Sequence, residues 1–289
     1  MNLRDLEYLV AIADLRSFGA AANRCFVSQP TLSGQIKKLE ASLGARLFER
    51  TNKQVMPTEI GQAVVEAARR VLREAETIRE IADSSRDPLS GRFRLGAFPT
   101  LSTYLFPELV RKIARAMPKL RLILIEEKTA VLLARLQSGE LDAALVALPV
   151  SDGRLAAREL FTDPFLLAVP PGHPLAKSKH IDPEELSQHR LMLLEEGHCL
   201  RDQALELCRL GGISEEPDFR ATSLETLRLM VKAGTGITLM PAIAVRGRES
   251  GIRYIPFSAP APSRRIGLVW RKTSARLQLI ERLCGLLSP

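Results

Sequence analysis

Three short segments near the N-terminus carry apolar residues at helical spacing. Leu3, Leu6 and Leu9 recur every three residues, which places them on one face of a predicted first helix. A second helix is predicted over 18–24, where alanine is frequent and Ser17 suits the N-cap position. Small side chains allow helices to cross closely, so we expect a compact helical domain here.

The third predicted helix begins after Ser28 and has one apolar and one polar face. Pro30 falls in its first turn, where a missing N–H group costs nothing. The predicted inward residues are Leu32, Ile36, Leu39 and Leu43, and the polar residues that point elsewhere are Gln29, Thr31, Ser33, Gln35 and Lys37. Three short helices, the last of which exposes small hydrogen-bonding groups, are typical of a helix-turn-helix DNA-binding domain. A merely solvated helical face explains the same pattern.

Residues from Thr58 to about Ser85 form a long predicted helix with a narrow apolar stripe. The stripe consists of Ile60, Val64, Ala67, Val71, Ala75, Ile78 and Ala82. Their spacing of three and four residues is typical of a seam that packs against another helix. Its own short domain offers no cover for a stripe of about 40 Å, so we expect a homodimer. Packing against the chain's own C-terminal module is the alternative.

Apolar runs of strand length alternate with helical patterns after a loop at 87–91, which is the predicted domain boundary. The predicted strands span 93–98, 120–126, 141–148, 165–169, 191–194, 219–221, 237–240, 252–256 and 266–271. The predicted helices span 104–116, 130–137, 200–210, the residues after Ser223, and 275–287. This alternation predicts an α/β module with two lobes and a ligand site between them.

Composition indicates where in the cell the protein is expected and which class of partner it could bind. A chain of 289 residues suggests two domains, and contents of 46% hydrophobic and 26% charged residues indicate a globular protein. The first residues are charged and no apolar run reaches the length of a membrane span, so we expect a cytoplasmic protein with no membrane contact. The net charge of +8 permits nucleic-acid binding without locating it.

The four cysteines are Cys25, Cys199, Cys208 and Cys284, and they suggest redox chemistry rather than a metal site. None belongs to a CxxC pair and no histidine stands at ligand spacing from two of them, so we expect neither a metal nor a cofactor. Cys199 opens the predicted helix 200–210. Amide groups at a helix N-terminus, together with the charge of Arg201, favour a thiolate at Cys199.

The separation of Cys199 from Cys208 bears on any disulfide between them. Nine residues along one helix place the two side chains on opposite faces, with Cα atoms roughly 13 Å apart. A disulfide needs a Cα separation of about 4.4–6.8 Å, so this helix would have to unwind. The alternative is that both are small core residues. Cys25 and Cys284 are interpreted as packing residues.

The N-terminal motifs resemble one known family. Phe18-Gly19-Ala20-Ala21-Ala22, Val27-Ser28-Gln29-Pro30-Thr31-Leu32-Ser33 and Leu47-Phe48-Glu49-Arg50 are similar to the winged helix-turn-helix of LysR-type transcriptional regulators. The resemblance implies a wing over 46–57. It also implies DNA contacts from Ser28, Gln29, Pro30, Thr31, Ser33, Gln35, Lys37, Arg50, Asn52 and Lys53.

Further motifs resemble the hydrogen-peroxide-sensing branch of that family. They are Ser33-Gly34-Gln35, the block from Gly197 to Gln203, Cys208, and the segment 219–228. The resemblance implies that Cys199 reacts with peroxide and that Cys208 resolves the product as a disulfide. It also implies a peroxide pocket built from Thr100, Thr129, His198, Arg201 and Arg228. Thr100 and Thr129 also fit helix caps, and His198 also fits a simple hydrogen bond to a backbone carbonyl.

The resemblance implies an α/β chain with an all-α winged helix-turn-helix head, a long linker helix and a two-lobed, periplasmic-binding-protein-like module. The expected domains are 1–58 for DNA binding, 59–90 for the linker and hinge, and 91–289 for redox sensing. Lobe I is expected over 91–162 and 267–289, and lobe II over 163–266.

The expected activity is transcription regulation, not catalysis. The expected partners are double-stranded DNA, further copies of the chain in a dimer of dimers, hydrogen peroxide, a cytosolic thiol reductant and RNA polymerase. Two alternatives remain open at this stage. One is a LysR-type regulator that binds a small organic ligand between its lobes, and the other is a thiol peroxidase.

Overall fold

The computed structural model describes residues 1–50, 55–84, 87–197, 200–205, 214–245, 247 and 249–287. The chain divides into two compact units, Met1–Ser85 and Arg86–Pro289, which we call the head and the regulatory unit. None of the helices in the described parts of the chain combines the length and the apolar composition that a membrane crossing requires.

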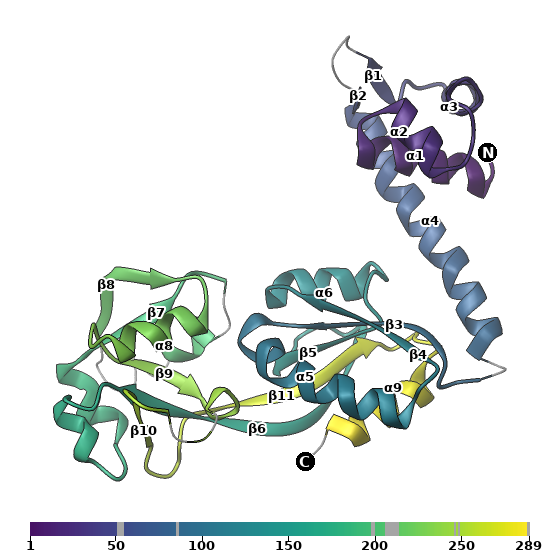
Figure 1. Cartoon of the computed structure of the whole chain (residues 1–289). Helices are drawn as coiled ribbons and strands as arrows, with labels where there is room; N and C mark the ends of the chain where they lie inside the picture. Colours follow the sequence, from purple (N-terminus) through teal and green to yellow (C-terminus); the bar gives the residue numbers. More distant parts are fainter. Residues whose placement is uncertain are drawn as a thin grey trace. The chain divides into compact units, whose positions relative to one another are not determined.

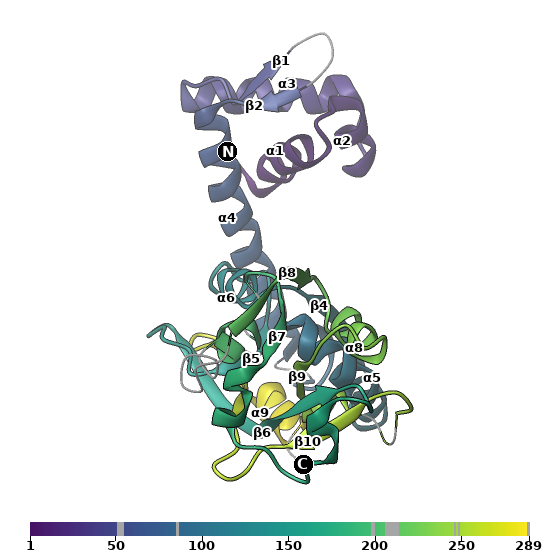
Figure 2. The same ribbon diagram turned by 90° about the vertical axis from the view of Figure 1, so that its left-hand side faces the viewer.

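Helices dominate the head, and a hairpin completes it (Figures 1 and 2). In chain order its elements are α1 (Leu3–Leu15), α2 (Phe18–Arg24), α3 (Gln29–Leu43), β1 (Phe48–Arg50), β2 (Val55–Pro57) and α4 (Glu59–Ser84). The four helices lie where the hydrophobic pattern predicts them. The head is not all-α as predicted, because β1 and β2 pair in an antiparallel hairpin. Strands of three residues are too short to show an alternation in the sequence.

Side-chain caps set the helix starts in the head. Ser17 and Ser28 each accept a hydrogen bond from the backbone N–H three residues further on, which confirms both predicted N-caps. The Thr58 hydroxyl makes two hydrogen bonds: it accepts one from Gly61 N–H and donates one to the carbonyl of Arg46. The start of α4 is therefore tied to the chain that leaves α3.

One apolar core joins α1, α2, α3 and the first half of α4. The approach of α4 is so close that a Cβ at Gly61 would lie 2.0 Å from the Leu47 carbonyl oxygen, so only glycine fits there. Asp14 accepts from Arg24 at 2.9 Å and from Arg69 at 2.5 Å, which ties α1 to both α2 and α4. These contacts hold α1, α2 and α4 around the core to which α3 also contributes.

Part of the apolar stripe of α4 is exposed on the head. Ile60, Val71 and Ile78 are 56%, 46% and 69% exposed. Leu43 was predicted to point inward but is 42% exposed, because the last turn of α3 runs beyond the core that ends at Leu39. An apolar groove of about 410 Å³ lies between α4 and Leu43.

The regulatory unit is built on one seven-stranded mixed sheet and a second pair of strands. The main sheet has the order β10 (Arg253–Pro256), β6 (Leu155–Val169), β11 (Ser263–Arg271), β5 (Ala143–Leu148), β3 (Gly91–Ala97) and β4 (Leu120–Glu126), with β9 (Thr238–Pro241) paired to β6. The separate parallel pair is β7 (Arg190–Leu194) and β8 (Ser214–Ala221). The helices are α5 (Pro99–Ala116), α6 (Thr129–Gln137), α8 (Leu224–Lys232) and α9 (Leu277–Leu287), with short 3₁₀ turns at Pro174–Lys177, Pro183–Gln188 and Ala242–Ala244.

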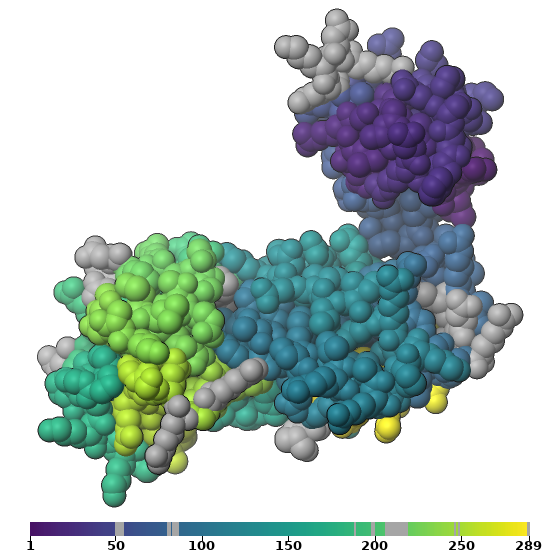
Figure 3. All heavy atoms as spheres, viewed as in Figure 1, coloured from purple at the N-terminus to yellow at the C-terminus, as the bar shows by residue number. Residues whose placement is uncertain are grey.

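Two lobes share the long strands β6 and β11 (Figure 1). Lobe I contains β3, β4, β5, α5, α6 and α9, and lobe II contains β7, β8, β9, β10 and α8. Each lobe has its own apolar core. Figure 3 shows the lobes side by side, with lobe I in blue and teal and much of lobe II in green. A two-lobed α/β unit was predicted from the alternation of strands and helices.

Some element limits differ from the prediction. Helix α5 begins at Pro99 rather than at residue 104, because proline is well suited to the first helical position. Strand β6 begins at Leu155 rather than at residue 165, because it pairs with β11 along its whole first half. The predicted helix 200–210 is helical over 200–205, and its remainder lies outside the described residues.

A buried ion pair holds α5 to the crossing of β6 and β11. The Arg264 guanidinium is fully buried and lies 2.8 Å from the Asp163 carboxylate, which also accepts from Ile243 N–H at 3.0 Å. Arg264 donates to Thr100 Oγ1 at 2.9 Å and to the Thr100 carbonyl at 3.1 Å. Its guanidinium carbon lies 5.1 Å from the Phe98 ring centroid. Lobe I is thereby joined to the shared strands.

We predict that Asp163→Asn destabilises the regulatory unit by about 3–5 kcal/mol, because it leaves a buried guanidinium without its counter-charge. Glu159→Gln is the matched control, since its pair with Arg265 joins the same two strands but is exposed. That change should cost only about 0–1 kcal/mol. Urea unfolding followed by the fluorescence of Trp270, the single tryptophan, measures both. Equal losses in the two variants would contradict the assignment.

Candidate functional site

The polar face of α3 is the candidate DNA-binding surface. Gln29, Pro30, Thr31 and Lys37 are exposed, and Ser33 and Gln35 are partly exposed. A Cβ built at Gly34 would meet no described atom within 4 Å, so contacts within the head do not explain the glycine. Ser28 Oγ hydrogen-bonds both the N–H and the hydroxyl of Thr31, so this predicted DNA contact is also the N-cap of α3. The accessible polar face suits a nucleic-acid groove.

The wing is positioned by a carboxylate on α3. Glu40 Oε1 accepts from the N–H groups of Leu47 and Phe48, at 2.8 and 3.4 Å. The chain that leads into β1 therefore has a fixed place relative to α3. Arg50 is the last residue of β1. Asn52 and Lys53 lie outside the described residues.

In lobe I, two loops meet because the strands before them are parallel neighbours. β3 and β4 pair with Ala97 opposite Glu126, and Glu127 N–H donates to the Ala97 carbonyl at 3.3 Å. Thr100 follows the end of β3, and Thr129 follows the end of β4. The carboxyl edge of parallel strands is where α/β proteins bind ligands. The sheet thus brings these two predicted pocket residues to the same edge.

Thr100 lies in the first turn of α5, where Arg264 uses it as an acceptor. It is not the N-cap, because Phe98 holds that position without a side-chain hydrogen bond. Thr100 is 3% exposed. A hydroxyl that accepts from Arg264 directs its own proton elsewhere, so Thr100 can donate to a nearby oxygen.

Thr129 carries an unsatisfied hydroxyl. Its alternative role as N-cap of α6 is wrong, because Lys128 holds that position. The Oγ1 atom of Thr129 is buried and has no hydrogen-bond partner among the residues that the structure describes. A buried polar group without a partner costs roughly 1–3 kcal/mol. Such a group is a candidate for binding a ligand.

Arg201 is held at the start of the helical segment 200–205. Its side chain is buried, and Nη1 donates to the Leu194 carbonyl at the end of β7, at 3.0 Å. Leu200 and Ala204 are 3% and 2% exposed and belong to the core of lobe II. The segment is therefore anchored by one buried charge and two apolar side chains.

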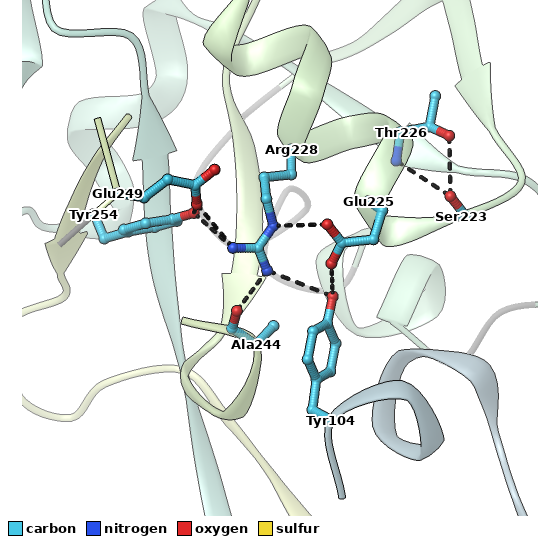
Figure 4. A network of polar contacts seen from close by, with 8 residues as sticks. All are labelled: Tyr104, Ser223, Glu225, Thr226, Arg228, Ala244, Glu249 and Tyr254. Carbon is cyan, nitrogen blue, oxygen red and sulfur yellow. Dashed lines mark hydrogen bonds and ion pairs between the residues drawn. The ribbon is translucent and has the colours of Figure 1, made fainter. Parts of the chain in front are cut away.

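Arg228 is the centre of a polar network that joins the two lobes (Figure 4). Its described hydrogen-bond and ion-pair partners are Tyr104, Glu225, Glu249, Tyr254 and the Ala244 carbonyl. Thr100 and Thr129 are not among these partners. Tyr104 comes from α5 of lobe I, yet its ring packs into the core of lobe II. The network thus links α5 to α8.

The protonation states in this network follow from burial and charge. Burial and the hydrogen bond to Glu225 raise the pKa of Tyr104 to about 12, so the phenol stays protonated and donates to that carboxylate. Burial opposes the charge of Arg228, but hydrogen bonds to Tyr104 and Glu249 outweigh it and raise the pKa of Arg228. The same guanidinium helps to hold the pKa of Glu249 below its usual value in spite of desolvation.

The remaining predicted pocket residue and the four cysteines divide into two groups. His198, Cys199 and Cys208, which were predicted to react or to line the pocket, lie outside the described residues. Cys25 is partly buried against the core of the head, and Cys284 is 1% exposed in the core of lobe I. Burial raises the pKa of both thiols, which disfavours the reactive thiolate. Their interpretation as packing residues is confirmed.

Sequence reasoning missed three residues of this region. Arg264 shares the inward face of β11 with Ile266, and a charge at such a strand position signals a buried partner. Tyr104 stands four residues after Thr100, on the same side of α5. Lys128 Nζ lies 3.1 Å from Glu195 Oε1 and donates to the Glu196 carbonyl at 2.9 Å, which joins lobe I to the loop after β7.

Comparison with known proteins agrees with this division of the chain. Residues 3–62 match the bacterial regulatory helix-turn-helix protein, lysR family, and residues 86–288 match the LysR substrate binding domain. The chain is 46% identical to the DNA-binding transcriptional dual regulator OxyR of Escherichia coli strain K12, over 98% of this chain and 93% of that protein. It is 48% identical to the hydrogen peroxide-inducible genes activator of Pectobacterium carotovorum subsp. carotovorum, over 98% and 94%.

A solved structure resembles the whole chain. Full-length OxyR from Pseudomonas aeruginosa, carrying a substitution of aspartate for cysteine, superposes with a TM-score of 0.79 at 39% identity, over 99% of this chain and 94% of that one. The arrangement of a helix-turn-helix head followed by a two-lobed regulatory unit is therefore shared.

We predict that removing the two threonine hydroxyls affects stability differently. Thr100→Val should cost about 1–3 kcal/mol of unfolding free energy, because Arg264 loses a buried acceptor. Thr129→Val should stay within about 0.5 kcal/mol of the wild type or stabilise it, because that hydroxyl has no described partner. Urea unfolding with Trp270 fluorescence compares them. A larger loss for Thr129→Val than for Thr100→Val would contradict the contacts described here.

Proposed function

We propose that this chain, which belongs to the LysR family of bacterial transcription regulators, is an activator that senses hydrogen peroxide through Cys199 and Cys208. Like other members of this family, it is a DNA-binding regulator, and it is not an enzyme. The structural observation that carries the proposal is the buried Thr129 hydroxyl, at a corner of lobe I that contacts the residues just before His198. A protein 48% identical to this chain is named for genes that peroxide induces.

The proposed pocket supplies what peroxide reduction needs. The Cys199 thiolate attacks one peroxide oxygen, the O–O bond breaks, and the sulfur becomes a sulfenic acid while hydroxide leaves. The leaving oxygen must receive hydrogen bonds and a proton to become water. Thr100 and Thr129 provide hydroxyl donors on one edge of the sheet, and His198 is the proposed proton source. The Cys208 thiolate then attacks the sulfenic sulfur, the S–O bond breaks as the disulfide forms, and the released hydroxide takes a proton from solvent to become a second water.

Arg201 is proposed to stabilise the thiolate by its charge. Its guanidinium is held by the Leu194 carbonyl at the beginning of the helical segment 200–205, and a nearby cation lowers the pKa of a thiol. Arg228 is the second predicted cation. Its described partners place it in the network between the lobes, so we propose that its part in the pocket is to hold α5 and α8 together.

The described contacts also indicate what a disulfide would cost. Leu200 and Ala204 are buried in the core of lobe II. If Cys199 and Cys208 begin on opposite faces of one helix, oxidation must unwind it and withdraw these side chains from the core. A strained disulfide is more easily reduced, so a cytosolic thiol reductant is the proposed partner that resets the sensor.

The head is proposed to read the operator in the usual manner of its fold. The face of α3 from Gln29 to Lys37 enters the major groove, and the wing that contains Arg50, Asn52 and Lys53 contacts phosphates. Like other members of the family, the protein forms homo-oligomers. The exposed stripe of α4 and its groove are the proposed dimer contact, and a dimer of dimers is the proposed assembly.

Finer parts of the organisation are also proposals. We assign 1–58 to DNA binding, 59–90 to the linker and hinge, and 91–289 to redox sensing, with a lobe II of about 163–266. The regulatory unit is proposed to be of the periplasmic-binding-protein type. The proposed place of action is the cytoplasm, where the chain meets DNA and RNA polymerase.

We predict separate roles for the two cysteines. Cys199→Ser should abolish the rapid loss of thiols after a small dose of peroxide. Cys208→Ser should keep the fast first step and leave a trappable sulfenic acid at Cys199. Peptide mapping under non-reducing conditions measures both. If Cys208→Ser lost the fast step as completely as Cys199→Ser, the roles would be wrong.

We predict that contacts to bases and to phosphates separate in binding experiments. Gln29→Ala and Thr31→Ala should weaken specific binding more than non-specific binding, by about 1–3 kcal/mol for a lost base contact. Arg50→Ala should weaken both and flatten the salt dependence. Ser42→Ala, at the other end of α3, is the control and should change neither. Unchanged operator affinity in the first three variants would overturn this assignment.

A further inference from the structure

Lys128 is an unfavourable residue for the position it occupies. It is the N-cap of α6, with φ −61° and ψ 147°, and its side chain makes no capping hydrogen bond. N-caps favour side chains that accept hydrogen bonds, and the N-terminus of a helix repels positive charge. A locally unfavourable lysine is explained only if its side chain has a task elsewhere.

That side chain reaches lobe II and contacts three consecutive residues. Lys128 Nζ lies 3.1 Å from Glu195 Oε1 and donates to the Glu196 carbonyl at 2.9 Å. Its aliphatic part lies over Gly197, since a Cβ built there would come within 3.1 Å of Lys128 Cδ. One lysine thus fixes a side chain, a carbonyl and a glycine of the same loop.

The backbone of that loop depends on such support. Gly197 has φ +85°, in the region that side chains rarely occupy, so the chain has more conformational freedom there than at other residues. Gly197 stands two residues before Cys199 in the sequence. Lys128 stands one residue before Thr129, the threonine whose buried hydroxyl has no hydrogen-bond partner among the described residues.

We propose that Lys128 is a positioning residue for the peroxide reaction, which clasps residues 195–197 of lobe II against the corner of lobe I that carries Thr129. This inference rests on the proposed function. The clasp sets the distance between the segment that leads to the reacting thiol and the Thr129 hydroxyl, which would donate a hydrogen bond to the leaving oxygen. Small errors in such a distance slow a reaction in which two groups must be aligned.

The expected effect is moderate because the contact is exposed. The side chains of Lys128 and Glu195 are 40% and 41% exposed, and exposed ion pairs contribute little free energy. Loss of this ion pair together with the backbone hydrogen bond from the reactive arrangement should lower the rate about three- to tenfold.

The test is the second-order rate of Cys199 oxidation by hydrogen peroxide in the reduced full chain. Lys128→Gln should lower this rate about three- to tenfold, and Lys128→Arg should restore it, because a guanidinium can donate to both partners. Glu195→Gln should also slow the reaction, because it removes the charge that Lys128 binds.

Lys112→Gln is the matched control. Lys112 also pairs with a glutamate, Glu108 at 3.0 Å, and with a backbone carbonyl, that of Leu286 at 3.5 Å, but these contacts join α5 to α9 and do not involve residues 195–197. Lys112→Gln changes the net charge by the same amount as Lys128→Gln. It should leave the rate of Cys199 oxidation within twofold of the wild type. The unfolding midpoint should change by a similar small amount in Lys128→Gln and Lys112→Gln, because each variant loses one exposed ion pair and one hydrogen bond to a backbone carbonyl.

Two results separate this inference from the proposal on which it rests. A wild-type chain whose Cys199 does not react rapidly with peroxide would overturn the proposed function and the clasp with it. A wild-type chain that reacts rapidly, beside a Lys128→Gln variant that is equally fast, would overturn the positioning role alone. The positioning role would also be wrong if Lys128→Arg were as slow as Lys128→Gln.

Discussion

The buried pair of Arg264 and Asp163 is the interaction on which the regulatory unit depends. β6 runs from lobe I into lobe II and pairs with β11 up to the crossing between the lobes, where these two residues face each other. Burying two charges is costly unless both are fully hydrogen-bonded. Arg264 meets this condition by binding Asp163 and Thr100. The requirement for satisfied hydrogen bonds therefore fixes the first turn of α5 on the shared strands.

The position of the candidate site follows from that constraint. Once α5 is fixed through Thr100, Tyr104 on the next turn reaches the core of lobe II and the Arg228 network. The parallel pairing of β3 with β4 brings the Thr129 corner to the same edge of the sheet. The site is thus assembled by sheet register and one buried charge, and only then by the residues that would meet peroxide.

Local rules predicted the helices and several of their ends. Helices were predicted to begin after Ser17, Ser28 and Ser223, and each serine is the N-cap and accepts a backbone hydrogen bond from the first turn. The same rule misplaced Thr129, because Lys128 occupies a position where the rule does not expect a lysine. Exceptions to local propensity are informative, since they mark residues whose role is set by distant contacts.

Long-range pairings were beyond the reach of the pattern. Arg264 and Asp163 are 101 residues apart, and Lys128 and Glu195 are 67 residues apart. Nothing in the local sequence names either partner, and the predicted strand 266–271 did not reach Arg264. The motif resemblance supplied the predicted pocket residues, but it gave no contact for Lys128 and no burial for Arg264. Both follow from the fold rather than from any segment of the chain.

Three sets of contacts tie the regulatory unit together, and they differ in strength. Which of them is weakest matters for a sensor that must be reversible. The Arg264 pair is fully buried, the Arg228 network is partly buried, and the Lys128 clasp is exposed. Motions that accompany function use the weakest contacts of a structure, since these open at a small cost in free energy. The weakest of the three ties is the one that holds residues 195–197, next to the proposed reactive thiol. Oxidation could therefore release this loop by breaking an exposed ion pair, while the buried pair keeps the lobes joined and preserves the pocket for the return to the reduced state.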